Sequence, residues 1–193
     1  MDDILAATRK GQGIRFHETG VRSVGRQARG VKCMTLAKGD EIVGAAKAEI
    51  QNSEFGIRNN EQRTESKEQN EEATQPLNSP TKLITITENG FGKRCEFDEF
   101  RAQSRGGKGV CCHRLSEKTG KLAGIAEVSE EDDLMLITDS GIIIRVAAAT
   151  IPVYSRTAGG VIVMRTGDNA KITGFAAVKP EAEESGEEGE KND

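Results

Sequence analysis

The sequence predicts an all-β fold made of propeller-like blades, each with four antiparallel strands. A unit of about 45 residues recurs three times along the 193-residue chain, and every copy contains four short apolar runs separated by turns. Repeats of roughly 40 to 50 residues with four strands each are typical of propeller blades. Three blades are fewer than the roughly four to eight that close a propeller, so we expect an incomplete array.

The three repeats share one register. They align without gaps at 8–31, 87–110 and 138–161. Each has a Thr three residues before a Gly, namely Thr8/Gly11, Thr87/Gly90 and Thr138/Gly141. Two arginines and a Gly-Val pair then follow at fixed spacing: Arg15, Arg94 and Arg145; Arg26, Arg105 and Arg156; Gly30-Val31, Gly109-Val110 and Gly160-Val161. This agreement indicates one structural unit built three times.

The second copy illustrates the expected strands. The β-branched run 83–87 and the segment 92–97 flank the turn "ENG", which predicts a hairpin. After a glycine-rich loop, 110–115 and 122–128 read as two further strands around the turn "EKTGK". On this pattern the blades cover 1–46, 83–128 and 129–179.

Charge is segregated along the chain. Residues 180–193 hold seven acidic residues and one lysine, and residues 47–82 hold seven acidic and five basic residues. Subtracting these contributions of −6 and −2 from the net charge of −4 leaves +4 on the remaining body, which favours a polyanionic partner. Both segments are too polar to build a core. We therefore expect 47–82 to be a disordered insertion and 180–193 a disordered acidic tail.

Nucleotide binding and catalysis are not indicated. The glycine-rich stretch 102–110 has neither the spacing of a Walker phosphate loop nor that of a dinucleotide fingerprint, so no nucleotide cofactor is expected. His17 and His113 lack any Ser, Cys or carboxylate pattern that would make them catalytic.

The cysteines and the apolar pattern favour a cytoplasmic protein. Cys33, Cys95, Cys111 and Cys112 form no C-x-x-C pair, which favours reduced thiols over a metal site or a disulfide framework. No apolar run reaches the length of about 18 residues that a membrane span needs, and the first residues do not resemble a secretory signal.

Segments of the repeats resemble one bacterial family. "LITITENGFGKRCEFDEFRAQSRGGKGV", "LMLITDSGIIIRV" and "IPVYSRTAGGVIVMR" are similar to the C-terminal DNA-wrapping domain of bacterial DNA gyrase A. The likeness covers 3–46 and 83–178, and an acidic tail also suits the family. The resemblance implies a six-bladed β-pinwheel, of which this chain resembles the last three blades, with DNA bent around a basic outer rim.

The glycine-rich stretch resembles the family's signature heptad, Gln-basic-Arg-Gly-Gly-basic-Gly. Six positions match, and they are Gln103, Arg105, Gly106, Gly107, Lys108 and Gly109. Ser104 departs from the pattern, and the position in the second repeat is that of a degenerate copy. The Arg-Tyr pair of the DNA-cleavage site has no counterpart, because Tyr154 follows Val153. The resemblance thus implies a non-catalytic part of an ATP-hydrolysing type II topoisomerase.

We expect binding and bending of double-stranded DNA without base readout, through cations spaced along the phosphates and glycine loops that approach them closely. The expected contacts are Arg26, Arg29, Lys32, Gln103, Arg105, Gly106, Gly107, Lys108, Gly109, Arg156 and Arg165. For the arginine that recurs as Arg26, Arg105 and Arg156, a second interpretation is that it caps carbonyls of a neighbouring blade.

The implied partners are double-stranded DNA, the gyrase B protein and the rest of the gyrase A protein, with no membrane. A tethered acidic tail would compete with DNA for the basic rim. Two alternatives stay open: the corresponding domain of topoisomerase IV, and a propeller-like module that binds proteins. The second alternative needs exposed aromatic or apolar patches, and the chain has no Trp, one Tyr and six Phe.

Overall fold

The structure is all-β, as the sequence predicts. The computed structural model describes residues 2–48, 81–167 and 170–179; the acidic tail and nearly all of the predicted insertion lie outside the described residues. The first repeat supplies β1 (Asp3–Thr8), β2 (Gln12–His17) and β3 (Ile42–Ala48). The second supplies β4 (Lys82–Thr87), β5 (Phe91–Cys95), β6 (Val110–Cys111) and β7 (Leu122–Val128). The third supplies β8 (Asp133–Thr138), β9 (Ile143–Ala147), β10 (Val161–Ile162) and β11 (Ile172–Val178).

The recurring Thr and Gly build the hairpin turns. Gly90 donates its N–H to the carbonyl of Thr87 at 3.1 Å, and the hydroxyl of Thr87 accepts the N–H of Phe91 at 3.2 Å. Gly90 has φ of 82°, a conformation that residues with a side chain rarely adopt. The first and third repeats repeat both hydrogen bonds, which explains why the two residue types keep their spacing.

One strand of each four-stranded sheet comes from the following repeat. β6 pairs with β2, so that Val110 lies opposite Gly13, and β10 pairs with β5, so that Val161 lies opposite Gly92. The sheets have the orders β3-β1-β2-β6, β10-β5-β4-β7 and β11-β8-β9. Four-stranded antiparallel blades are therefore confirmed in two sheets, and the third sheet has three strands among the described residues. One prediction needs correction: the short strand after the glycine-rich loop does not join the blade of its own repeat. The loop carries it across to the preceding sheet.

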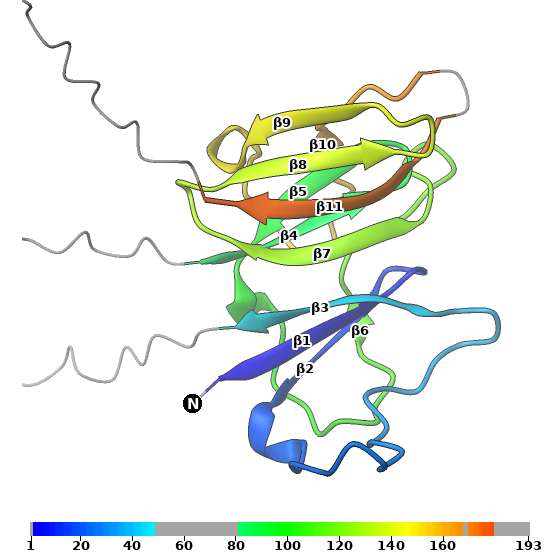
Figure 1. Cartoon of the computed structure of the whole chain (residues 1–193), viewed down its shortest axis with the longest axis vertical. Helices are drawn as coiled ribbons and strands as arrows, with labels where there is room; N and C mark the ends of the chain where they lie inside the picture. The colour runs from blue at the N-terminus through cyan, green and yellow to red at the C-terminus, as the bar shows by residue number, and fades with distance from the viewer. Residues whose placement is uncertain (1, 49–80, 168–169, 180–193) are drawn as a thin grey trace, which may run out of the picture.

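The sheets stack with an apolar core between each pair (Figure 1). Side chains alternate along β4, so Leu83 packs toward the first sheet while Ile84 and Ile86 pack toward the third. Two buried residues complete these cores from the turns that follow the second strands, namely Phe100 in the first core and Ile151 in the second. The middle sheet is thus buried on both faces.

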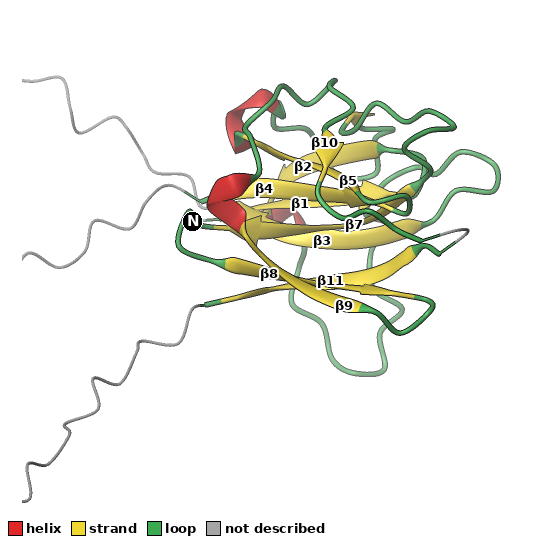
Figure 2. Ribbon diagram, turned by 90° about the horizontal axis from the view of Figure 1, so that it is seen from above, coloured by secondary structure: helices red, strands yellow, loops and turns green. Residues whose placement is uncertain are grey.

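The first recurring arginine joins one repeat to the next. A 3-10 turn follows the second strand of each repeat, at Glu18–Gly20, Phe97–Glu99 and Ala148–Thr150 (red in Figure 2). Arg15 donates to the carbonyls of Phe97 and Phe100, at 2.9 and 3.2 Å. Arg94 donates to the carbonyl of Ile151 at 2.6 Å. Both guanidiniums are buried, so the contact holds adjacent blades in a fixed orientation.

An ion-pair chain links all three repeats. Arg9 pairs with Glu88, and Glu88 also lies 3.6 Å from the Nζ of Lys171. Burial raises the pKa of Glu88, but the hydrogen bond and charge of Arg9, together with the charge of Lys171, outweigh burial and hold this pKa below its ordinary value. The carboxylate is therefore ionised at neutral pH and connects three blades.

Two polar side chains are buried between the second and third repeats. Lys93 donates its Nζ protons to the carbonyls of Ser155 and Arg156, at 2.7 and 2.6 Å, and burial lowers its pKa. The His113 Nε2 lies 3.1 Å from the carbonyl of Gly159, and its Nδ1 lies 2.9 Å from the Thr85 hydroxyl. Burial lowers the pKa of His113 to about 4, so the ring is neutral and donates from Nε2. Both side chains fix the third repeat on the second.

Candidate nucleic-acid interface

Three equivalent loops carry cations without any carboxylate. They run over 21–36, 100–115 and 151–166, and contain no Asp or Glu. The first two hold four cations each and the third holds two: Arg22, Arg26, Arg29 and Lys32; Arg101, Arg105, Lys108 and Arg114; Arg156 and Arg165. A run of cations with no local counter-charge produces a positive potential over the loops.

The second loop is hydrogen-bonded to the first. The N–H of Gly106 donates to the carbonyl of Cys33 at 2.6 Å, and the N–H of Thr35 donates to the carbonyl of Gly107 at 2.7 Å. Arg105 adds two bonds from its guanidinium, to the carbonyl of Gly20 at 2.7 Å and to that of Lys32 at 3.1 Å. The glycine-rich stretch is therefore held by backbone contacts, and Lys32 and Lys108 lie on adjoining segments.

The third loop repeats this contact on the second. The N–H of Arg114 donates to the carbonyl of Ala158 at 3.3 Å, and the Arg156 guanidinium donates to the carbonyl of Cys111 at 3.0 Å. Cys111 stands in the register position of Lys32, so Arg105 and Arg156 make the same bond one repeat apart. The three loops thus form one continuous row, which we call the basic row.

Most cations of the basic row are free of partners within the described part of the chain. Arg26, Arg29, Lys32, Lys108 and Arg165 are exposed, and their side chains make no ion pair or hydrogen bond with any described residue. Of the predicted contacts, the structure brings Lys32, Lys108 and Arg105 together on the first two loops. Free, unpaired cations keep their full charge for an anionic partner.

The arginine that recurs as Arg26, Arg105 and Arg156 was also expected to cap carbonyls of a neighbouring blade, and the structure has this geometry at two of the three positions. Arg105 and Arg156 both donate to carbonyls of the preceding repeat, whereas Arg26, whose repeat has none before it among the described residues, has no such contact. Arg105 remains exposed, so a capping role leaves part of its guanidinium open to solvent. Contact with phosphate stays a prediction for all three.

The heptad glycines make close backbone contacts within the protein. Gly109 has φ of 76°, and a Cβ on it would lie 2.5 Å from the carbonyl oxygen of Gly13. Gly106 uses its N–H on Cys33, and Gly107 its carbonyl on Thr35. Gln103 is half-buried, and its side-chain N–H groups have no hydrogen-bond partner among the described residues. These residues shape the loop on which Lys108 is carried.

Three cations of the row were not singled out from the sequence, namely Arg22, Arg101 and Arg114. None of them belongs to the recurring arginines or to the heptad. Arg22 and Arg101 occupy the same register position, and Arg114 is the counterpart of Arg165. They can be identified when the three repeats are aligned, because each aligned loop lacks carboxylates and its cations then stand out.

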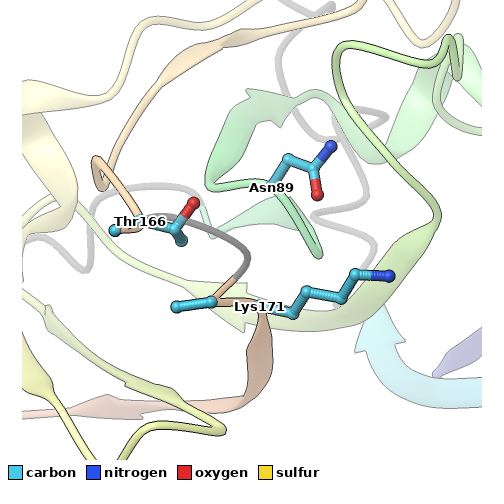
Figure 3. A pocket seen from close by; sticks show the side chains of 5 residues that line it. Asn89, Thr166 and Lys171 are labelled. Atoms are coloured by element: carbon cyan, nitrogen blue, oxygen red, sulfur yellow. The ribbon is translucent and has the colours of Figure 1, made fainter.

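An open pocket of about 400 Å³ lies at the boundary of the second and third repeats (Figure 3). Asn89, Thr166 and Lys171 line it, with Gly167 and Ala170. These side chains offer one ammonium and two neutral polar groups, and the ammonium also faces Glu88. The described ranges contain no group of three or more His, Cys, Asp and Glu side chains that could hold a metal ion, and no helix long and apolar enough to cross a membrane.

Comparison with known proteins decides the family. The model of the family described as "DNA gyrase C-terminal domain, beta-propeller" matches the chain three times, at 2–49, 81–129 and 132–179. The chain belongs to this DNA gyrase C-terminal domain family. The three matched stretches are the three repeats, so each repeat is matched by the family separately.

The similar full-length proteins are gyrase A proteins. The chain is 35% identical over 187 residues to the DNA gyrase A protein of Staphylococcus aureus strain MRSA252, and 35% identical over 191 residues to that of strain NCTC 8325 / PS 47. The alignments cover 97% and 99% of this chain. The chain spans only 18% of the length of these relatives.

Two solved structures share the fold. The C-terminal domain of DNA topoisomerase IV superposes with a TM-score of 0.72 at 21% identity, over 93% of this chain and 47% of that one. The DNA gyrase A C-terminal domain superposes with a TM-score of 0.70 at 21% identity, over 91% of this chain and 50% of that one. The three blades therefore correspond to about half of such a domain.

Proposed function

We propose that this chain binds double-stranded DNA along the basic row and bends it, without reading the base sequence. The observation that carries the proposal is the row itself: three equivalent loops, bonded to one another in order, with cations and no carboxylates. Cations spaced along a curved stack of blades can each neutralise a phosphate and release its counterion. The helices among the described residues are three-residue turns that precede the loops, so none of them is long enough to read a groove.

We infer that the chain acts as part of a gyrase A protein. Family membership and the identity to gyrase A proteins support this assignment. In that setting the blades would position a bent DNA segment for ATP-dependent negative supercoiling by the rest of gyrase A together with gyrase B, in the cytoplasm. A topoisomerase IV protein is the second candidate, because its C-terminal domain superposes as well as that of gyrase A.

The proposal is tested by fluorescence anisotropy with two duplexes of unrelated sequence, and by energy transfer between dyes at the two ends of one duplex. We expect equal affinities for the two sequences, a steep fall in affinity with salt, and increased energy transfer on binding. A strong preference for one duplex would contradict binding without base readout. Binding with unchanged energy transfer would contradict bending and leave DNA binding in place.

A further inference from the structure

The third loop of the basic row is poor in free cations. Arg156 donates from its guanidinium to the carbonyl of Cys111 at 3.0 Å, and its backbone N–H donates to Oε2 of Glu99 at 2.6 Å. Arg165 is the other cation of the loop, and it has no ion pair or hydrogen bond with any described residue. The first loop, by contrast, has four cations. If the third loop contacts the same duplex, it therefore needs more than charge.

Apolar side chains stand in the third loop where the other loops have cations. Ile162 holds the register position of Lys32, and Pro152 holds that of Arg101. Ile162 is 51% exposed, and Tyr154 in the same loop is 41% exposed. The third loop thus replaces charge by exposed apolar and aromatic surface.

Tyr154 occupies the position of the first heptad residue, Gln103. The backbone is held in the same way at both positions. The N–H of Tyr154 donates to the carbonyl of Arg94, and the N–H of Gln103 donates to the carbonyl of Arg15, each at 2.8 Å. Tyr154 therefore presents a phenol at the position where the second loop presents an amide expected to contact DNA.

Neighbouring repeats do not cover this position. In the middle repeat, which has a described repeat on each side, Ala102 is exposed and Gln103 is half-buried. The Oε1 of Gln103 lies against its own loop, 3.7 Å from where a Cβ on Gly107 would be. Val153 and Tyr154, at the positions of Ala102 and Gln103, are both exposed. The exposure of the tyrosine therefore belongs to the loop, whichever blades flank the third repeat.

We propose that Tyr154 is a contact of the third loop with the DNA backbone, with its hydroxyl donating to a phosphate and its ring packed against the adjoining deoxyribose. The proposal rests on the binding of duplex DNA along the basic row and names the chemistry of the contact at this loop. Tyrosine hydroxyls are among the groups that bond to phosphate oxygens and fix the position of a protein on a duplex. Hydrogen bonds to an ionised acceptor are also about twice as strong as those between neutral groups.

Two observations favour DNA over a protein as the partner of Tyr154. First, the third loop is continuous with the basic row, because the N–H of Arg114 donates to the carbonyl of Ala158 and Arg156 binds the second loop. Second, the aromatic ring is isolated: no phenylalanine among the described residues is exposed. The residues that dominate protein interfaces cluster, whereas a contact with a sugar and a phosphate needs a single ring.

A neutral contact affects DNA binding differently from a cation. The phenol releases no counterion when it binds a phosphate, so it adds to the affinity without adding to the salt dependence. The contribution of Tyr154 should therefore persist at salt concentrations that weaken the contacts of Lys108 and Arg165.

The first test measures how accessible the ring is. Tyr154 is the single Tyr of the 193-residue chain, which has no Trp, so the intrinsic fluorescence reports on this one side chain. Acrylamide, a neutral quencher, is titrated with and without a duplex whose saturation is checked by anisotropy. We expect the quenching constant to fall when the duplex is bound.

The outcomes separate this proposal from the proposed function. A quenching constant that stays unchanged at saturation would overturn the contact of Tyr154 and leave DNA binding along the basic row in place. A wild-type chain that binds no duplex would contradict the proposed function itself, and this contact with it.

The second test compares Tyr154→Phe and Tyr154→Ala with a matched control. Loss of the hydroxyl in Tyr154→Phe should raise the dissociation constant about threefold to tenfold, and Tyr154→Ala should raise it further, with the slope of log K against log salt unchanged in both. Val178→Ala is the control, because this side chain is 39% exposed on β11, outside the three loops. It should bind as the wild-type chain does, and all three variants should keep the wild-type unfolding midpoint.

Two results of this comparison would overturn the proposal. If Tyr154→Phe binds as tightly as the wild-type chain, the hydroxyl makes no contact with phosphate. If either substitution of Tyr154 makes the salt slope shallower, Tyr154 acts through the cations and not by a contact of its own.

Discussion

The guanidinium of Arg94 binds the main-chain carbonyl of Ile151 across the boundary between the second and third repeats, with Nε at 2.6 Å from the oxygen. Replacing Arg94 by Met removes the donor and leaves buried carbonyls without a partner. We expect this to lower the free energy of unfolding by about 2 to 4 kcal/mol.

The control for this prediction is Arg145→Met, the same change one repeat later on an exposed side chain. In dilute solution it should alter the free energy of unfolding by no more than about 0.5 kcal/mol. Urea unfolding followed by circular dichroism measures both values. Equal losses in the two variants would contradict the role given to Arg94.

Gly109 and Gly30 form a second matched pair of substitution sites, because only Gly109 closely approaches another backbone segment, at Gly13. Gly109 and Gly30 both have φ of 76°, so Ala is strained at either position by about 1 kcal/mol. At Gly109 the new Cβ would also lie 2.5 Å from a backbone oxygen, whereas at Gly30 nothing lies within 4 Å. We therefore expect Gly109→Ala to cost clearly more stability than Gly30→Ala and to loosen the pairing of β6 with β2. Hydrogen exchange at Cys112, whose N–H donates to Gly11, reports on that pairing.

Burial of neutral His113 makes stability depend on pH. Its pKa is lowered to about 4 in the folded chain, below the ordinary value of 6.5, so the unfolded chain takes up the proton first. The stabilisation is present above pH 6.5 and is lost as the pH falls toward 4. Between pH 7 and 5 the wild-type chain should lose about 2 kcal/mol more stability than His113→Gln. Parallel losses in the two proteins would show that another group dominates.

Arg105 and Lys108 are neighbours in the heptad with different environments. Arg105→Lys keeps the charge but loses the two-carbonyl contact, so we expect lower stability, by about 1 kcal/mol, and an unchanged salt dependence of DNA binding. Lys108→Ala removes a free cation, so the slope of log K against log salt should become shallower by about one unit at unchanged stability. An unchanged salt slope in Lys108→Ala, or a larger loss of stability in Lys108→Ala than in Arg105→Lys, would contradict these roles.

The sequence predicts the repeats and their strands well because the signals are local. Thr87 and Gly90 specify a turn within four residues, and alternation along 83–87 specifies a strand. The exchange of β6 into the preceding sheet could not be predicted, because a strand of two residues has no periodicity of its own. The buried contacts of Lys93 and Arg94 were missed for a related reason: charged side chains read as exposed unless their partners, 55 to 63 residues away, are known.

The candidate site was predicted in part. The recurring spacing identified Arg26, and the likeness to the heptad identified Lys108; both residues, and Arg165, which was also predicted, are exposed in the structure. The sequence pattern could not distinguish free cations from those that bind carbonyls. Arg105 and Arg156 differ from Arg26 only in having a preceding described repeat to contact.

The central claim is that the basic row contacts DNA phosphates across all three repeats. The most direct test removes one free cation from each loop, in a variant with Arg26→Ala, Lys108→Ala and Arg165→Ala. The control variant, with Lys38→Ala, Lys121→Ala and Lys179→Ala, changes the net charge equally at exposed positions outside the row. Salt titrations of duplex binding should show a slope shallower by up to about three units for the first variant and nearly unchanged for the control. Equal slopes for both variants and the wild-type chain would contradict the claim.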